Sequence, residues 1–243
     1  MKPISSFIFF LVITSTSILG AGFPASYYKV TNIKEQKEFF FSHLYELIED
    51  ENLQILQDRQ MLKNTLSNNL FNINYKSKNF PKLLKLKKKY NVKSIFSLNE
   101  FLEKVDVVPP SLALAQAAVE SGWGKSRFVK EANNIFGHWT YGEKGLIPKN
   151  RDENAKHKIR IFDSLQKSIR AYMLNLNSNR AYLLFREKRL QLREINLLPL
   201  GKELSATMKN YSGIGKKYLK ILRTLINGQN LSRFDYQFFN KFN

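Results

Sequence analysis

One acidic residue stands in surroundings that suit proton transfer. Glu120 lies at the end of an Ala-rich helix predicted from Pro110 to Ser121, which Gly122 stops. Positions 113, 116, 117 and 120 share one face of that helix, and small neighbours let other elements pack close to the carboxylate. Partial desolvation and the negative end of the helix dipole both disfavour the charged form and raise its pKa. Glu120 is therefore a candidate general acid.

Aromatic residues beside glycines and amides follow the candidate acid. Gly122-Trp123-Gly124 flanks an indole with two residues that lack side chains, and the segment 133–139 combines Asn134 with Phe136 and Trp139. Sugars bind aromatic faces through their C–H surfaces, while amides pair with hydroxyl and acetamido groups. Together the two segments predict a carbohydrate cleft. The alternative interpretation is a solvated Glu at a helix end and Trp-Gly pairs that serve packing.

The elements that must position these residues are mainly helical. Alternating polar and apolar residues at 156–161 predict one short strand, of the kind that forms one side of a small hairpin. Ser97 and Glu100 have the spacing of a capping box, and Asp163 or Ser164 caps a later helix. Helical apolar spacing predicts further helices at 33–56, 165–176, 181–192 and 218–226.

Composition and the N-terminal residues limit the classes of protein to which the chain can belong. Lys and Arg number 39 against 20 Asp and Glu, a net charge of +19 that favours anionic polymers or surfaces. The absence of Cys and the presence of only three His exclude thiol catalysis and Cys-based zinc sites, so we expect no metal and no cofactor. An apolar run at 7–13 before Gly22 predicts a secretory signal peptide, with an uncleaved anchor as the alternative.

The residues around Glu120 closely resemble a known family. Val108 to Phe128, containing Glu120-Ser121-Gly122-Trp123-Gly124, is similar to the bacterial Bax protein family, which belongs with the peptidoglycan hydrolases of glycoside hydrolase family 73. The similarity continues through 133–137, through 171–177 with Ala181-Tyr182, and through Tyr211-Ser212. It implies a lysozyme-like α lobe and a small β lobe, with N-terminal helices added.

The resemblance also implies roles for particular residues. Glu120 is then the general acid, Tyr211 lies beside the cleft, and Gln116, Trp123, Asn134, Phe136 and Trp139 are the predicted substrate contacts. The second catalytic group stays open between Glu143, Asp152, Glu153 and the substrate's own acetamido group. Separated carboxylates would invert the anomeric centre and closer ones would retain it.

The sequence thus predicts four segments and one function. They are a signal peptide at 1–22, a helical extension at 23–96, a catalytic domain at 97–228 and a C-terminal tail at 229–243. The predicted function is exported hydrolysis of the β-1,4 bond after N-acetylglucosamine in peptidoglycan strands, and a non-catalytic wall-binding protein is the alternative. We expect no nucleic-acid partner, and membrane contact only through an uncleaved signal segment.

Overall fold

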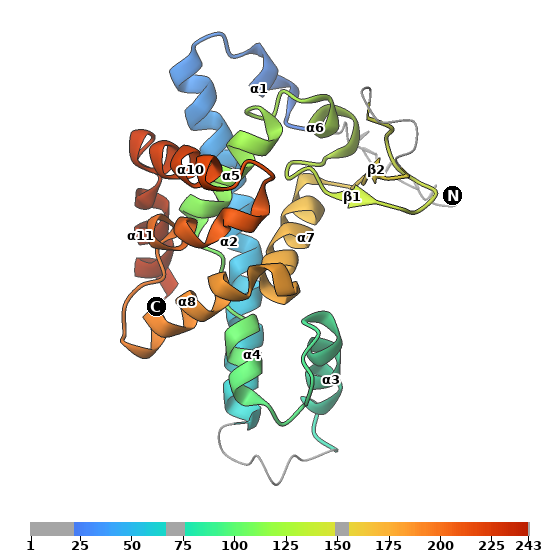
Figure 1. Cartoon of the computed structure of the whole chain (residues 1–243), viewed down its shortest axis with the longest axis vertical. Helices are drawn as coiled ribbons and strands as arrows, with labels where there is room; N and C mark the ends of the chain where they lie inside the picture. Colours follow the sequence, from blue (N-terminus) through green and yellow to red (C-terminus); the bar gives the residue numbers. More distant parts are fainter. Residues whose placement is uncertain (1–21, 67–75, 149–155, 243) are drawn as a thin grey trace, which may run out of the picture.

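The computed structural model describes residues 22–66, 76–148 and 156–242. Within these ranges helices dominate, and one two-stranded hairpin projects from the side of the helical body (Figure 1). In chain order the elements are α1 (Ala25–Lys29), α2 (Ile33–Leu66), α3 (Phe80–Lys89), α4 (Leu98–Lys104), α5 (Pro110–Ser121), α6 (Arg127–Ala132), β1 (Trp139–Thr140), β2 (Lys158–Ile159), α7 (Leu165–Ser178), the 3-10 helix η1 (Arg180–Tyr182), α8 (Leu183–Glu194), α9 (Gly201–Leu204), the 3-10 helix η2 (Ser205–Tyr211), α10 (Lys216–Gly228) and α11 (Ser232–Phe242). The predicted mainly α, lysozyme-like fold with a small β element is confirmed.

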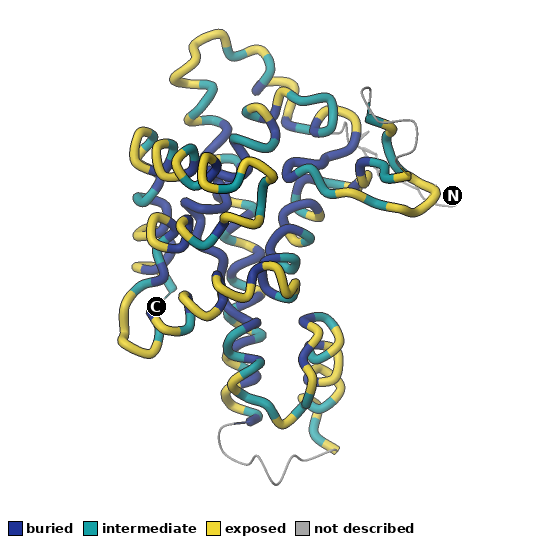
Figure 2. Tube along the Cα trace, viewed as in Figure 1, coloured by how far each residue is buried: buried dark blue, intermediate teal, exposed yellow. Residues whose placement is uncertain are grey.

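Helix α5 lies in the core because almost all of its side chains are small or apolar. Its residues 110–118 are buried on every side, and α2, α9, α10 and α11 pack around it (Figure 2). The helix ends where Gly122 takes a left-handed conformation, with φ of 55°, and its N–H donates to the carbonyl of Ala118. A residue without Cβ adopts that conformation at little cost. The end of α5 therefore fixes the position of Glu120.

The start of α5 is held by a buried carboxylate from the last helix of the chain. Asp235 is fully buried and accepts hydrogen bonds from the Ser111 N–H (2.7 Å), the Ser111 hydroxyl (2.6 Å) and the Gly201 N–H (2.8 Å). The carboxylate thus satisfies amides in the first turns of both α5 and α9, which have no partners inside their own helices. The predicted C-terminal tail contains α11, which packs into the core through this contact.

Helix α2 runs along the long axis of the molecule and packs against α4, α5 and α7 (Figure 1). Its buried Asn52 donates to the Val108 carbonyl (2.9 Å) and accepts from the Val108 N–H (3.0 Å), which fixes the segment leading into α5. The N-terminal helical segment thus forms part of the core that supports α5. None of the helices among the described residues is long and apolar enough to cross a membrane.

The predicted capping box at the start of α4 is wrong. The Ser97 side chain makes no capping hydrogen bond. The Glu100 carboxylate, the other half of the predicted box, accepts from the Lys93 N–H (3.0 Å) and pairs with Lys104 (2.9 Å), whose largely buried ammonium needs a carboxylate. At α7 the sequence left two caps open, and the structure selects Ser164, whose hydroxyl accepts from the Lys167 N–H.

The two strands form the antiparallel hairpin that the polar and apolar alternation indicated. Trp139 pairs with Ile159 and Thr140 with Lys158, and Leu146 adds a bridge to Ile159. Residues 1–21 of the signal peptide predicted at 1–22 and the candidate acids Asp152 and Glu153 lie outside the described residues.

Candidate active site

Glu120 occupies the last turn of α5, half-buried, with one hydrogen-bond partner among the described residues. The Tyr218 hydroxyl, from the first turns of α10, donates to Glu120 Oε1 at 2.7 Å. Burial raises the pKa of Glu120 above its usual range, while the Tyr218 hydrogen bond favours the carboxylate and lowers the pKa in part. A carboxyl poised in this way can hold a proton at higher pH than an exposed one, as a general acid must.

A chain of hydrogen bonds continues behind the acid. Gln116 Nε2 donates to the Tyr218 hydroxyl oxygen (3.1 Å), and Gln116 Oε1 accepts from the Tyr172 hydroxyl (2.7 Å). Gln116 is fully buried, one helical turn before Glu120. The structure therefore places this predicted substrate contact behind the acid, where it fixes the direction of the Tyr218 hydroxyl.

Stacked aromatic rings surround this hydrogen-bond chain. Tyr211 lies parallel to Tyr218, with ring centroids 5.7 Å apart and planes 6° apart. Phe136 stacks on Tyr172 at 3.8 Å, and Tyr182 lies 5.9 Å from Tyr211. We call Phe136, Tyr172, Tyr182, Tyr211 and Tyr218 the aromatic cluster.

Tyr211 is the member of the aromatic cluster with a free polar end. It stands at the end of η2, is partly exposed, and its hydroxyl has no hydrogen-bond partner in the described part of the chain. Burial of the ring and the nearby Tyr172 and Glu120 raise the pKa of Tyr211 well above 10. The hydroxyl thus stays protonated and can donate to a bound ligand beside Glu120.

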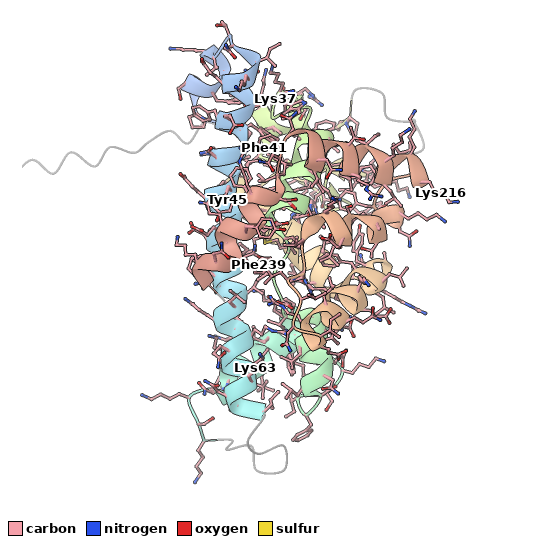
Figure 3. The ribbon with its side chains drawn as sticks, turned by 90° about the vertical axis from the view of Figure 1, so that its left-hand side faces the viewer. Lys37, Phe41, Tyr45, Lys63, Lys216 and Phe239 are labelled. Carbon is pink, nitrogen blue, oxygen red and sulfur yellow. The ribbon has the colours of Figure 1, made fainter. Side chains whose placement is uncertain are left out.

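Trp123 faces a different part of the molecule. Its indole packs edge-on against Phe40 (5.7 Å) and Phe41 (5.4 Å) of α2, and the Lys37 ammonium lies 4.7 Å from the ring centroid. Figure 3 shows Lys37 and Phe41 on this side of α2. The Tyr27 hydroxyl donates to the Trp123 carbonyl at 2.5 Å. The tryptophan after Glu120 thus joins the N-terminal helices to the end of α5.

Asn134 and Trp139 belong to the base of the hairpin. Asn134 is buried and donates to the carbonyls of His138 and Arg160 (both 2.8 Å) while it accepts from the His138 N–H (2.9 Å). Burial lowers the pKa of His138 to about 4. Trp139 is 58% exposed and stacks on His157 at 4.2 Å, so its outer face is open to a ligand.

The second catalytic group has no clear candidate in the described chain. Glu143 is exposed on the hairpin connection, and no second carboxylate among the described residues contributes to the pKa of Glu120. The same residues contain no group of three potential metal ligands.

The sequence interpretation missed Tyr172, Tyr182 and Tyr218 as parts of the site. Tyr218 was predicted only as the start of a helix, seven residues after Tyr211. That spacing gives no signal by itself, because the turn at Ser212–Gly215 separates the two residues along the chain. Only the packing of η2 against α10 brings them together.

The helical body, the small hairpin and the half-buried acid beside tyrosines are features of lysozyme-like glycoside hydrolases. A family model described as mannosyl-glycoprotein endo-β-N-acetylglucosaminidase matches residues 95–231, and the chain belongs to this glucosaminidase family. The chain is also 36% identical over 144 residues to Protein bax of Escherichia coli strain K12. That alignment covers 58% of this chain and half of the bacterial relative. No solved structure gave a match.

Proposed function

We propose that the protein is an exported hydrolase that cleaves the β-1,4 bond after N-acetylglucosamine in peptidoglycan, with Glu120 as the general acid. The observation that carries the proposal is the half-buried Glu120 with a raised pKa, hydrogen-bonded by Tyr218 beside stacked tyrosines. Membership of the glucosaminidase family supports the reaction class. The basic surplus of the chain suits an anionic wall polymer.

The proposed reaction begins with proton transfer to the leaving group. Glu120 gives its proton to the glycosidic oxygen while the bond from that oxygen to C1 of N-acetylglucosamine breaks. The acetamido oxygen of the same sugar attacks C1 and forms a cyclic oxazolinium ion. Water then adds to C1 while the bond from C1 to the acetamido oxygen breaks, which restores the acetamido group, and the proton of the water returns to Glu120.

Two observations support substrate assistance over Glu143 as the second catalytic group, while Asp152 and Glu153 lie outside the described residues. Glu143 is exposed on the hairpin connection, and no second acid in the described chain contributes to the pKa of Glu120. The Tyr211 hydroxyl, meanwhile, is available as a donor that can orient the acetamido group. Substrate-assisted hydrolysis needs one strong acid and such an orienting group.

The central test compares the parent with Glu120→Gln on purified peptidoglycan. The amide keeps the size of the side chain and can still accept from Tyr218, so the fold should survive. We expect release of reducing ends to fall by about 10²–10⁴-fold, the range for a lost general acid. If the amide variant releases reducing ends as fast as the parent, Glu120 is not the acid.

Three further measurements test the finer claims. Mass spectrometry of the released fragments should find N-acetylglucosamine at the new reducing ends, and N-acetylmuramic acid there would overturn the bond assignment. Glu143→Gln, Asp152→Asn and Glu153→Gln should each leave the rate within about twofold of the parent if the substrate supplies the nucleophile. Loss of activity in one of these variants would identify that acid as the second catalytic group instead. Export predicts that cell fractionation recovers the protein in the envelope fraction, where it begins near residue 23 or carries the uncleaved segment.

The second candidate function is binding without turnover. The observation that favours it is the same lack of a second carboxylate near Glu120 among the described residues. Retention of the protein on insoluble wall material, with no release of reducing ends by the parent, would support this candidate and exclude the hydrolase.

A further inference from the structure

A cavity lies away from the aromatic cluster and shares no residue with it. Its volume is about 620 Å³, and it opens between one face of α2, the segment after α8 and the last residue of α11. Leucines from α2 and from 197–198, together with Phe242, form its apolar part. The polar part comes from Gln57, Gln60, Asn196 and three cations, Arg59, Lys63 and Arg193. We call this cavity the cation pocket.

Positive charge exceeds negative charge around the cation pocket. Asp106 is buried behind it and is the carboxylate to which its arginines turn. Arg193 Nη2 lies 3.1 Å from Asp106 Oδ1, Arg59 Nη2 lies 3.8 Å from Oδ2, and the fully buried Arg189 places Nε 3.9 Å from Oδ2. One carboxylate therefore serves three guanidinium groups. None of the residues that line the cavity is acidic.

Arg193 donates to both Asp106 oxygens, through Nε (3.2 Å) and Nη2 (3.1 Å), whereas Arg59 and Arg189 each keep a nitrogen without a hydrogen bond. Arg59 Nη1 donates to the carbonyls of Leu102 (2.5 Å) and Val105 (2.9 Å), whereas its Nη2 is too far from Asp106 for a hydrogen bond. Arg189 Nε is buried with no hydrogen-bond partner in the described structure. Arg189 does not line the cavity, so its unused donor reflects the shortage of acceptors around Asp106, whereas Arg59 lines the cavity and its Nη2 can donate to an acceptor there.

Lys63 completes the cationic rim. It is exposed near the end of α2, below the end of α11 on the face shown in Figure 3, and it forms no ion pair with any residue that the structure describes. Its ammonium is a mobile point charge on a flexible stem, which suits capture of an anion at the mouth of a cavity.

We propose that the cation pocket binds an anionic group, a phosphate or a carboxylate, held by Arg59, Arg193 and Lys63. The electrostatics of the buried cluster agree with this. Burial and repulsion from Arg59, Arg193 and Arg186 lower the pKa of Arg189 to about 9, although Asp106 raises it in part. A bound anion supplies the negative charge that the cluster lacks. The amides of Gln57, Gln60 and Asn196 add neutral donors, and the leucines exclude water from one side.

An anion site here gives the protein a second place, apart from Glu120, at which it can bind a ligand. Binding of an anion in the cation pocket does not depend on the reaction at Glu120, so this proposal is tested separately from the proposed hydrolase. Charged groups of a wall polymer or a lipid headgroup both belong to the chemical class.

The test is the unfolding temperature of the full chain in sodium phosphate, in sodium glutarate and in sodium chloride at equal ionic strength. Matching ionic strength removes the general screening of a chain with net charge +19. We expect phosphate, glutarate or both to raise the unfolding temperature above that in chloride, because ligands that bind the native state stabilise it. A rise with only one of them identifies the group, provided that the rise saturates with anion concentration, because phosphate also stabilises proteins through exclusion from their surfaces. No saturating rise with either overturns the proposal.

A pair of variants tests whether the stabilising anion binds in this cavity. Lys63→Met should weaken binding of that anion about fivefold by calorimetric titration, the effect of losing about 1 kcal/mol of attraction. Lys216→Met is the matched control, since Lys216 is also exposed, lies at the start of α10 and does not line the cavity (Figure 3). Both variants remove one charge from the chain. Equal weakening in the two, or no weakening in Lys63→Met, places the anion elsewhere and overturns the proposal.

Discussion

The hydrogen bond from Tyr218 to Glu120 sets how far the pKa of the acid rises, and its removal gives a signed prediction. Tyr218→Phe deletes the hydroxyl that donates to Glu120 Oε1 at 2.7 Å but keeps the ring that stacks on Tyr211. That hydrogen bond favours the charged carboxylate and lowers its pKa, in opposition to burial. Without it the pKa of Glu120 should rise further.

The magnitude follows from the strength of a hydrogen bond to a charged group. Such bonds contribute about 1.5–3 kcal/mol, and Glu120 is only half-buried, so we take the lower end. At 1.36 kcal/mol per pKa unit this gives a rise of about one unit. A general acid must be protonated, so activity falls as pH increases through its pKa. The alkaline limb of kcat/KM should therefore move about one unit to higher pH.

Two readouts measure this shift. Initial rates of reducing-end release across pH give the limb, and a carbon-13 titration of the Glu120 carboxyl gives the pKa without requiring turnover. Tyr182→Phe is the matched control, since its hydroxyl belongs to the aromatic cluster but donates no hydrogen bond to Glu120. An unchanged pKa in Tyr218→Phe, a lower one, or an equal shift in the control would refute the reasoning.

Four substitutions test the elements around the site, each measured by denaturant unfolding. Asp235→Ala should lower the free energy of unfolding by about 3–5 kcal/mol, because it leaves three buried donors from Ser111 and Gly201 unpaired; a loss below about 1 kcal/mol would contradict this. Gly201→Ala should lower the free energy of unfolding by at least about 2 kcal/mol, since the added methyl meets the Ser111 hydroxyl and the Leu112 backbone nitrogen closer than real side chains approach. Trp123→Ala should lower the free energy of unfolding by about 2–3 kcal/mol through lost packing. The Trp139 side chain is 58% exposed, so Trp139→Ala should change the free energy of unfolding by less than about 0.5 kcal/mol and raise KM instead. The reverse pattern would make Trp123 the ligand contact.

Three buried polar side chains fix helix α5 in the core. Asn52 holds the segment before α5, Asp235 holds its first turn, and Gln116 ties its last turns to Tyr218. Each of these groups is buried and hydrogen-bonded, so each specifies a single arrangement. Glu120 is consequently positioned by contacts that begin in α2, α10 and α11.

Local sequence determined much of the scaffold. Pro110, the alanines and Gly122 encode the start, body and end of α5, because ring geometry, helix propensity and the left-handed stop all act within one segment. The alternation at 156–161 encoded one strand of the hairpin in the same way. The capping box at Ser97 failed because the carboxylate of Glu100 found a partner in Lys104 that a capping pattern does not weigh.

The surroundings of the acid were decided by tertiary structure. The sequence placed Glu120 at a helix end with a raised pKa, since burial by small neighbours and the helix dipole can be inferred within one element. It did not indicate that Tyr218, 98 residues later, donates to that carboxylate, or that Trp123 faces α2. Contacts between side chains from distant segments depend on how η2, α10 and α2 pack around α5, and no local spacing records that packing.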